Sequence, residues 1–267
     1  MAVPTEKMVI PGKRLGKHER KIDPRTLELA TYDAGLPMPP PSLTLSGKVP
    51  DWPLYMNDEL GDCAIAAPAH EIECWTANAG RERSLTMHDV LVAYEQVSGY
   101  KPRDPNHPTH NSTDNGCIML DVLHHWRHQG IGKDKITAYV LVSHTDTVAL
   151  QQALWLFGGV YLGLRLPETA SLQLENKEPW TVVAMIGKGE PNSWGGHAVN
   201  IVDYDEQYAT CVTWGNLQKM SWEFIQAYAD EAYGVLSGDW MNADTHKSPH
   251  GFDMPLLLAD LSKFSKP

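Results

Sequence analysis

The sequence predicts an α+β protein, with helices mainly in its first half and strands mainly in its second half. Between residues 63 and 130, apolar residues recur at the spacing of amphipathic helices, and glycines follow these segments. After residue 135, short runs of β-branched and aromatic residues have the length of strands. A cysteine at the start of the first long helix and a histidine at the start of a later strand would then face each other across a cleft, where ligands commonly bind.

The first 50 residues are rich in proline and basic residues, so few regular elements are expected there. Asp23 and Pro24 have the residue types of a helix cap and a first helical position, which predicts a short helix over residues 23–30. The proline-rich residues 37–41 exclude a regular helix or a central strand. Residues 42–45 alternate polar and apolar side chains and predict a short strand.

Three helices are expected next, over residues 63–79, 84–97 and 116–130. Pro68 lies beyond the first turn of the first helix and should kink it, because proline lacks the N–H of an internal turn. The loop between the other two, residues 99–115, contains His107 and His110 near Asp104 and Asp114. A polar loop is the default interpretation of this segment, and a metal site is the less favoured alternative.

The second half reads as strands broken by two helices. Strands are expected over residues 135–142, 160–166, 197–204 and 208–214, and helices over residues 147–157 and 221–232. Residues 205–207 would close a hairpin, and residues 167–196 would form a long connection along the wall of a cleft. After residue 239 the chain looks irregular except for the apolar residues 256–261.

Charge is distributed unevenly along the 267 residues. Residues 1–22 hold six Lys and Arg and two Glu, a net of +4, so the overall −11 leaves −15 for the remainder. Such an arm is expected either to dock on an acidic body or partner, or to remain a solvated tail. The net negative charge argues against general nucleic-acid binding, which needs clustered Lys and Arg.

Targeting and cysteine patterns favour a cytoplasmic protein. No apolar run is long enough for a signal peptide or for the roughly 18 residues of a membrane helix, so no membrane association is expected. The four cysteines, at positions 63, 74, 117 and 211, form neither a disulfide framework nor the close pairs of a zinc site. Free thiols in a reducing compartment, with no metal and no cofactor, are therefore expected.

The stretch over residues 57–67 carries the candidate chemistry. It reads as a glycine turn, then Cys63, then a helix of small residues. Unpaired N–H groups and the positive end of the helix dipole favour a thiolate there, so a lowered pKa is expected for Cys63. His197 is the candidate general base, and the Asn57 amide is the candidate donor to an oxyanion.

These motifs resemble those of the papain-like cysteine peptidases, over about residues 40–236. Asn57, six residues before Cys63, is similar to the family's oxyanion Gln, and the Asn-Gly-Cys at residues 115–117 is similar to a family segment before a helix. The stretch around His197 and the Thr-Trp-Gly at residues 213–215 are similar to the family's histidine strand and its Asn-Ser-Trp-Gly. The resemblance implies a helical half with the cysteine, an antiparallel sheet half with the histidine, and a cleft between them.

The sequence departs from the family pattern at three places. The family's orienting Asn is missing, so Thr213 or Asn216 would have to hold the imidazole. Asn57 is one methylene shorter than Gln. Residues 1–40 do not look like the long helical propeptide of secreted relatives, which suggests a divergent bacterial or phage type.

The predicted function is a thiol-dependent hydrolase, a peptidase or amidase, that uses Cys63, His197 and Asn57 on a peptide or amide substrate. Trp194, Gly196 and Trp214 would line its cleft. Acyl transfer to an amine is an open variant. The alternative is a non-catalytic protein of the same fold that binds a partner or a second copy through its N-terminal arm. The expected organisation is an extension over residues 1–40, a papain-like domain over 41–238 and a tail over 239–267 that packs on the domain.

Overall fold

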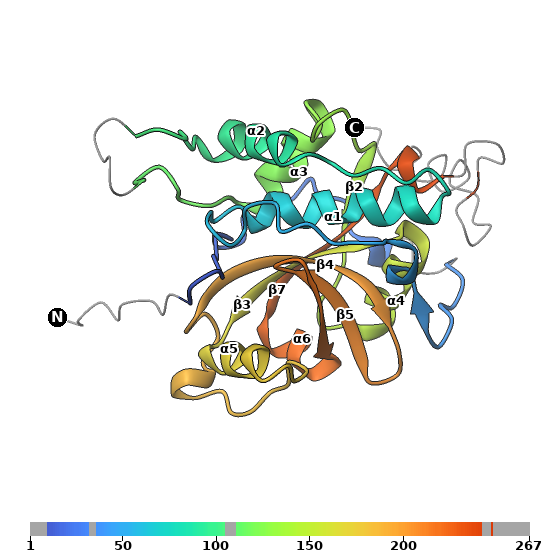
Figure 1. Ribbon diagram of the computed structural model, residues 1–267. Helices are drawn as coiled ribbons and strands as arrows, with labels where there is room; N and C mark the ends of the chain where they lie inside the picture. The colour runs from blue at the N-terminus through green and yellow to red at the C-terminus, as the bar shows by residue number, and fades with distance from the viewer. Residues whose placement is uncertain (1–9, 32–35, 105–110, 242–246, 248–267) are drawn as a thin grey trace.

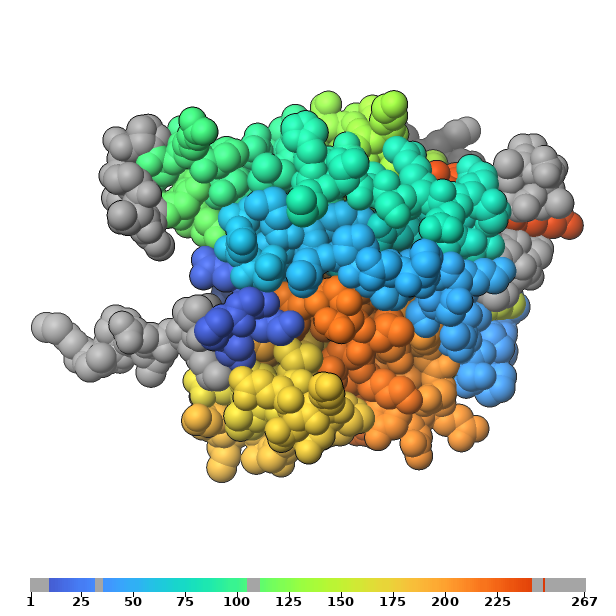
Figure 2. Space-filling view, in the orientation of Figure 1, coloured from blue at the N-terminus to red at the C-terminus, as the bar shows by residue number. Residues whose placement is uncertain are grey.

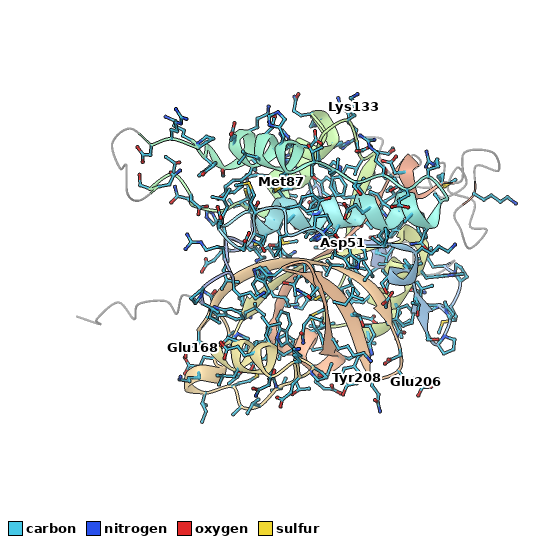
Figure 3. The ribbon with its side chains drawn as sticks, viewed as in Figure 1. Asp51, Met87, Lys133, Glu168, Glu206 and Tyr208 are labelled. Atoms are coloured by element: carbon cyan, nitrogen blue, oxygen red, sulfur yellow. The ribbon has the colours of Figure 1, made fainter. Side chains whose placement is uncertain are left out.

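Helix α1 (Cys63–Asn78) lies across an antiparallel sheet, and this contact joins the two halves of the molecule (Figure 1). The computed structural model describes residues 10–31, 36–104, 111–241 and 247. Helices α2 (Met87–Ser98) and α3 (Met119–His128) cover the side of α1 that faces away from the sheet. Figure 3 marks the same division, because Met87 and Lys133 lie on the helical side while Glu168 and Tyr208 lie on the sheet side. The predicted α+β architecture is thereby confirmed.

In the described part of the chain, seven strands form one sheet whose neighbours are all antiparallel. The order along its main path is β2-β7-β3-β4-β5-β6, and the short β1 pairs with β4 off this path. The strands are β1 (Leu43–Thr44), β2 (Ala138–Leu141), β3 (Val160–Leu166), β4 (Gly195–Tyr204), β5 (Tyr208–Thr213), β6 (Asn216–Ser221) and β7 (Ala229–Leu236). The long, buried β3 and β4 form its centre and carry the histidine side of the cleft.

Local sequence signals explain most helix boundaries. Thr86 and Asp89 form a reciprocal capping box at the start of α2, and Gly99 ends this helix with a φ of 76°. Asp146 caps α4 (Thr147–Phe157), and Gly158 ends it in the same left-handed conformation. Ser221 caps α6 (Trp222–Tyr228), as its sequence predicts.

The second half contains elements that the sequence pattern did not predict. The connection after β3 holds α5 (Glu168–Glu175), and the helix expected over residues 221–232 ends at Tyr228 because the chain continues as β7. Residues 216–221 form the unpredicted β6. Trp214 and Gly215, with φ values of 43° and 70°, make the two-residue turn before it.

The N-terminal region also differs from expectation. Asp23 accepts the backbone N–H of Arg25 and stabilises a turn, so the helix predicted over residues 23–30 does not form. His107, His110 and residues 256–261 lie outside the described residues. The domain boundaries at residues 40 and 238 remain a prediction.

Helix α1 runs through Pro68 without ending. Proline has no N–H for the carbonyl of Ala64, four residues earlier. The Tyr161 hydroxyl, from β3, donates a hydrogen bond of 2.7 Å to this carbonyl. The helix thus continues through Pro68, and a side chain of the sheet half satisfies the carbonyl that the proline leaves free, while the kink at Pro68 stays a prediction.

Replacing Tyr161 with Phe is expected to lower the free energy of unfolding by about 1–3 kcal/mol, since it leaves the buried Ala64 carbonyl unsatisfied. The loss should shrink in a Pro68→Ala background, because alanine restores the backbone N–H that proline lacks. Urea unfolding of both single variants and the double variant measures this coupling. Equal losses in the two backgrounds would show that the hydroxyl does not act through this carbonyl.

Candidate active site

Cys63 is the first residue of α1 and is only 1% exposed. Asp62 occupies the N-cap position but makes no side-chain cap hydrogen bond, and its Oδ1 atom has no hydrogen-bond partner. Burial raises the pKa of the Asp62 carboxyl well above its usual value. The cysteine therefore starts the helix, as expected, but the free helix end is closed off from water.

His197 lies on the central strand β4 and is 1% exposed. Its Nε2 atom lies 2.7 Å from the Thr213 hydroxyl, and its ring stacks on Trp214 with centroids 4.2 Å apart and planes 11° from parallel. The other ring nitrogen, Nδ1, is buried without a hydrogen-bond partner. With a proton on Nε2 donated to Thr213, Nδ1 is the nitrogen left to act as a base.

Of the two residues that were expected to orient the imidazole, the structure places Thr213 against it. The Asn216 amide instead donates to the carbonyl of Trp214, at 2.9 Å. Trp194 packs against Trp214, with the two ring centroids 5.6 Å apart. The histidine is thus held by a hydroxyl on one edge and a buried aromatic face.

Asn57 follows a strained turn. Tyr55 and Met56 have φ values of 53° and 70°, a conformation that non-glycine residues seldom adopt. The Asn57 side-chain amide donates to the carbonyl of Leu60 at 3.1 Å and to the carbonyl of Arg14 at 3.3 Å. The predicted oxyanion donor therefore contacts a carbonyl of the N-terminal arm.

The N-terminal arm, defined here as residues 10–20, lies between the helical half and the sheet half. Figure 2 shows the arm, in dark blue, at the seam between the two halves. On the helical side, the Gly16 carbonyl accepts the Cys117 N–H at 2.8 Å, and His18 donates its N–H to the Cys117 carbonyl at 2.9 Å. On the sheet side, Lys17 donates its N–H to the Gly196 carbonyl at 3.1 Å.

At its other end the arm contacts the aromatic group. Trp214 Nε1 donates to the Arg14 carbonyl at 3.2 Å, and the Lys13 ammonium lies 5.2 Å from the centre of the Trp214 ring. Cavities of about 350 and 470 Å³ border the arm. Their lining includes Trp194 and Gly196, two of the expected cleft residues.

Three glycines allow the backbones to approach this closely. A Cβ atom on Gly16 would overlap the carbonyl of Gly61, and one on Gly116 would overlap the carbonyl of Gly16. A Cβ atom on Gly196 would overlap the carbonyl of Lys17. The arm fits the cleft because side chains are missing from both surfaces.

Opposite charges also hold the arm. Arg14 pairs with Asp114 at 3.2 Å and, just beyond the arm, Lys21 pairs with Asp121 at 2.8 Å. The basic segment therefore docks on the acidic body of its own chain. The alternative of a solvated tail is wrong for these described residues.

The closed arm changes the acid–base properties of the pair. Burial raises the pKa of Cys63 to about 11, with the Asp62 carboxylate adding to this shift, while backbone groups of Ala198 and Gly16 oppose it. Burial lowers the pKa of His197 to about 3, and the nearby Lys13 charge adds to this effect. The expected lowered pKa of Cys63 is therefore wrong for this form, because desolvation outweighs the helix dipole. Both groups are neutral at pH 7.

The described residues contain no cluster of three or more His, Cys, Asp or Glu side chains that could hold a metal ion. Asp104 and Asp114 are engaged in the protein, the former by Ser112 and the latter by Tyr94. All four cysteines are free and buried. Within the same described ranges, no helix has the length and apolar character needed to cross a membrane.

Comparison with known proteins agrees with the fold. No protein-family model matches the sequence, and no curated protein matches it. Among solved structures, xylellain, a cysteine protease from Xylella fastidiosa, is similar with a TM-score of 0.62 and 16% identity, over 88% of this chain and 99% of that chain.

Two proforms are also similar. The ragweed pollen cysteine protease Amb a 11 in its proform has a TM-score of 0.52 and 16% identity, over 76% of this chain and 67% of its own. Procathepsin B S9 from Trypanosoma congolense has a TM-score of 0.52 and 11% identity, over 85% of this chain and 86% of its own. These likenesses confirm the papain-like fold that the motifs suggest.

Alkylation of Cys63 in the unmodified chain is expected to be slow, with a rate that still rises between about pH 7 and pH 10. Because the pKa is about 11, roughly 0.1% of the thiol is ionised at pH 8. Mass spectrometry after iodoacetamide treatment measures the rate at this site. A rate that reaches its plateau below about pH 8 would contradict the burial argument.

Proposed function

We propose that this chain is a thiol-dependent peptidase or amidase whose cleft is closed by its own N-terminal arm in the form described. The observation that carries the proposal is the geometry of His197, whose Nε2 faces Thr213 while Nδ1 stays unpartnered on the strand packed against the Cys63 helix. His70 is also buried with one ring nitrogen bonded and the other without a partner, so His197 is distinguished by its place on β4, the strand packed against the helix that begins at Cys63.

The proposed reaction begins when substrate replaces the arm. Nδ1 of His197 accepts the Cys63 proton, and the sulfur attacks the carbonyl carbon of the scissile amide. The Asn57 amide and the backbone N–H of Cys63 donate to the oxygen as it gains negative charge. His197 then gives its proton to the departing amine, which leaves the acyl group bound to Cys63 as a thioester. Water, or a second amine in the acyl-transfer variant, cleaves this thioester and releases the acyl group.

The position of the arm supports a latent form. The Asn57 amide and the Trp214 indole both donate to the Arg14 carbonyl, so a carbonyl of the arm already occupies Asn57, a donor that the reaction needs. Two of the similar solved structures are themselves described as proforms. The arm is short and extended, so it would act by occupying the cleft and by removing water from Cys63.

The same observations favour one alternative, a non-catalytic protein that uses this fold for binding. A filled cleft and a neutral Cys63–His197 pair are what a binding protein would show. The two functions differ in the effect of displacing the arm. A peptidase gains a reactive thiol that depends on His197, whereas a binding protein gains only an exposed, ordinary cysteine.

Gly16→Ala in the full chain is expected to displace the arm, because the added Cβ overlaps the backbone of Gly61. Alkylation of Cys63 at pH 7 should then accelerate by about 10-fold or more, as water returns to the thiol and its pKa falls. Glu19→Ala changes an exposed residue of the same arm and should leave the rate unchanged. An unchanged rate in Gly16→Ala would mean that the arm does not control this site.

Adding His197→Ala to the Gly16→Ala chain separates the two functions. For a peptidase, the pKa read from the pH profile of Cys63 alkylation should rise toward the ordinary thiol value of about 8.5. Hydrolysis of a random peptide mixture should be lost at the same time. A profile that is the same with and without His197 would favour the binding protein.

Thr213→Val in the Gly16→Ala chain is expected to slow peptide hydrolysis by about 10-fold to 100-fold, because the imidazole loses its orienting partner. Valine has nearly the same shape, so packing around Trp214 should be retained. Thr210→Val, a matched change on the same strand, should have no comparable effect. Equal rates for both variants would remove Thr213 from the mechanism.

A further inference from the structure

The Lys17 side chain is buried inside the protein. Only 1% of it is exposed, and its ammonium lies 2.9 Å from the Asp230 carboxylate and 3.1 Å from Glu231 Oε1. It also donates to the carbonyl of His18 at 3.0 Å. A lysine is almost never buried to this degree unless its charge is paired, as it is here by Asp230 and Glu231.

The walls of this pocket, which we call the acidic pocket, belong to the sheet half. Asp230 and Glu231 are on β7, and Gly163 on β3 is the direct cross-strand partner of Glu231. A Cβ atom on Gly163 would overlap the Lys17 stem and lie 2.7 Å from both Glu231 Cγ and Met119 Sδ. The space for a long unbranched side chain therefore depends on a glycine in the middle of a central strand, where glycine is otherwise unfavourable.

Among the described residues, Asp230 and Glu231 form ion pairs with Lys17 and with no other cation, while Arg20 donates to the backbone carbonyl of Asp230 at 3.3 Å and Arg165 lines the cavity beside Asp230. Glu231 is 0% exposed and accepts a hydrogen bond of 2.9 Å from the Tyr233 hydroxyl, which is a neutral donor. Burial raises the pKa of Glu231, and the charge of Lys17 opposes that shift. Without Lys17, the Glu231 carboxylate would be buried without its ion-pair partner, which is a costly arrangement.

The acidic pocket is also close to the candidate catalytic thiol. Lys17 donates its backbone N–H to the carbonyl of Gly196, the residue before His197. Its neighbour Gly16 places backbone beside the Cys63 thiol, where it lowers the pKa of that group. A chain that fills the cleft at Cys63 thus presents its next side chain to Asp230 and Glu231.

We infer that the acidic pocket is a specificity pocket, which selects a lysine or arginine side chain of the peptide substrate next to the residue at Cys63. This inference rests on the proposed function. Arginine fits the same chemistry, because its guanidinium can pair with two carboxylates at once. The competing explanation is that the ion pair is only a latch that holds the arm and plays no part in choosing substrates.

The first experiment measures binding and needs no catalysis. The host is the full chain with Gly16→Ala and Lys17→Met. The first change makes the arm clash with Gly61, and the second removes the ammonium that pairs with Asp230 and Glu231. The probe is a labelled peptide with the sequence of residues 10–20, compared with the same peptide carrying methionine at the Lys17 position. The lysine peptide should bind about 100-fold more tightly, and Glu231→Gln in the host should remove most of that difference.

The second experiment measures cleavage of a peptide library, randomised at each position, by the same host. Lysine and arginine should be selected at one position by about 100-fold over methionine. Glu231→Gln and Asp230→Asn should each reduce this selection without abolishing cleavage of other peptides. Glu223→Gln, which removes an exposed charge on α6, is the matched control and should leave it unchanged.

The outcomes separate the inference from the proposed function. Cleavage with no preference for a basic residue overturns the specificity pocket and leaves a latch, even if the lysine peptide binds more tightly. If no peptide is cleaved, the proposed function fails, and a lysine preference that depends on Glu231 still supports a pocket for basic side chains. Equal binding of the two labelled peptides overturns the pocket itself. Urea unfolding of each variant, Asp230→Asn included, confirms that the host remains folded.

Discussion

The buried ion pair between Lys17 and the carboxylates of β7 is the constraint on which the closed form depends. Moving three charges out of water is costly, and their mutual attraction repays this only when the geometry is close, as it is here at 2.9 and 3.1 Å. The pair ties Lys17, near the start of the described chain, to β7, the last strand of the described residues. It also fixes the register of the arm, so that Gly16 lies at Cys63 and Arg14 lies at Asn57.

The fit of the arm is specified by glycine on both surfaces. Gly16 approaches the backbone of Gly61 and Gly116, and Gly196 approaches the backbone of Lys17. Such contacts exclude water from the thiol more completely than side-chain packing would, because hydrogen-bonded backbones leave little space between them. Closure of the cleft and the low reactivity of Cys63 therefore have the same cause, since the tight approach that holds the arm also desolvates Cys63.

The sequence predicted the parts of the site that depend on local signals. A glycine turn before a small-residue helix placed Cys63, and an apolar strand placed His197 opposite it. Thr213 was one of two possible partners, and only the twist of the Trp214–Gly215 turn decides between it and Asn216. Asn57 was located by its spacing, but the carbonyl that it contacts comes from the arm and has no local signal.

Sequence patterns failed where long-range contacts override local preference. Strand β7 contains Ala229, Asp230 and Glu231, which favour a helix or a turn by propensity, and the buried Glu231 carboxylate is paired there with Lys17, which is far away in the sequence. Strand β6 was missed because Trp214 adopts a positive φ, which residue statistics do not predict for tryptophan. The sequence did not decide between a docked arm and a solvated tail, because the partners of the arm are scattered along the chain, at residues 57, 114, 117, 196 and 230.

The reactivity of Cys63 follows from which of two opposing effects dominates. The helix dipole and the backbone N–H groups at the start of α1 are permanent features and always favour the thiolate. Desolvation is partly conditional, because the arm, whose Gly16 backbone lies beside the thiol, contributes to the burial of Cys63. Displacing the arm leaves the dipole unchanged and readmits water, which lowers the pKa of the thiol and raises that of His197 toward its ordinary value. The pKa values of the two groups then approach each other, which is the condition under which a proton passes from thiol to imidazole. A segment of the chain's own N-terminal region can in this way govern whether a nucleophile exists at all.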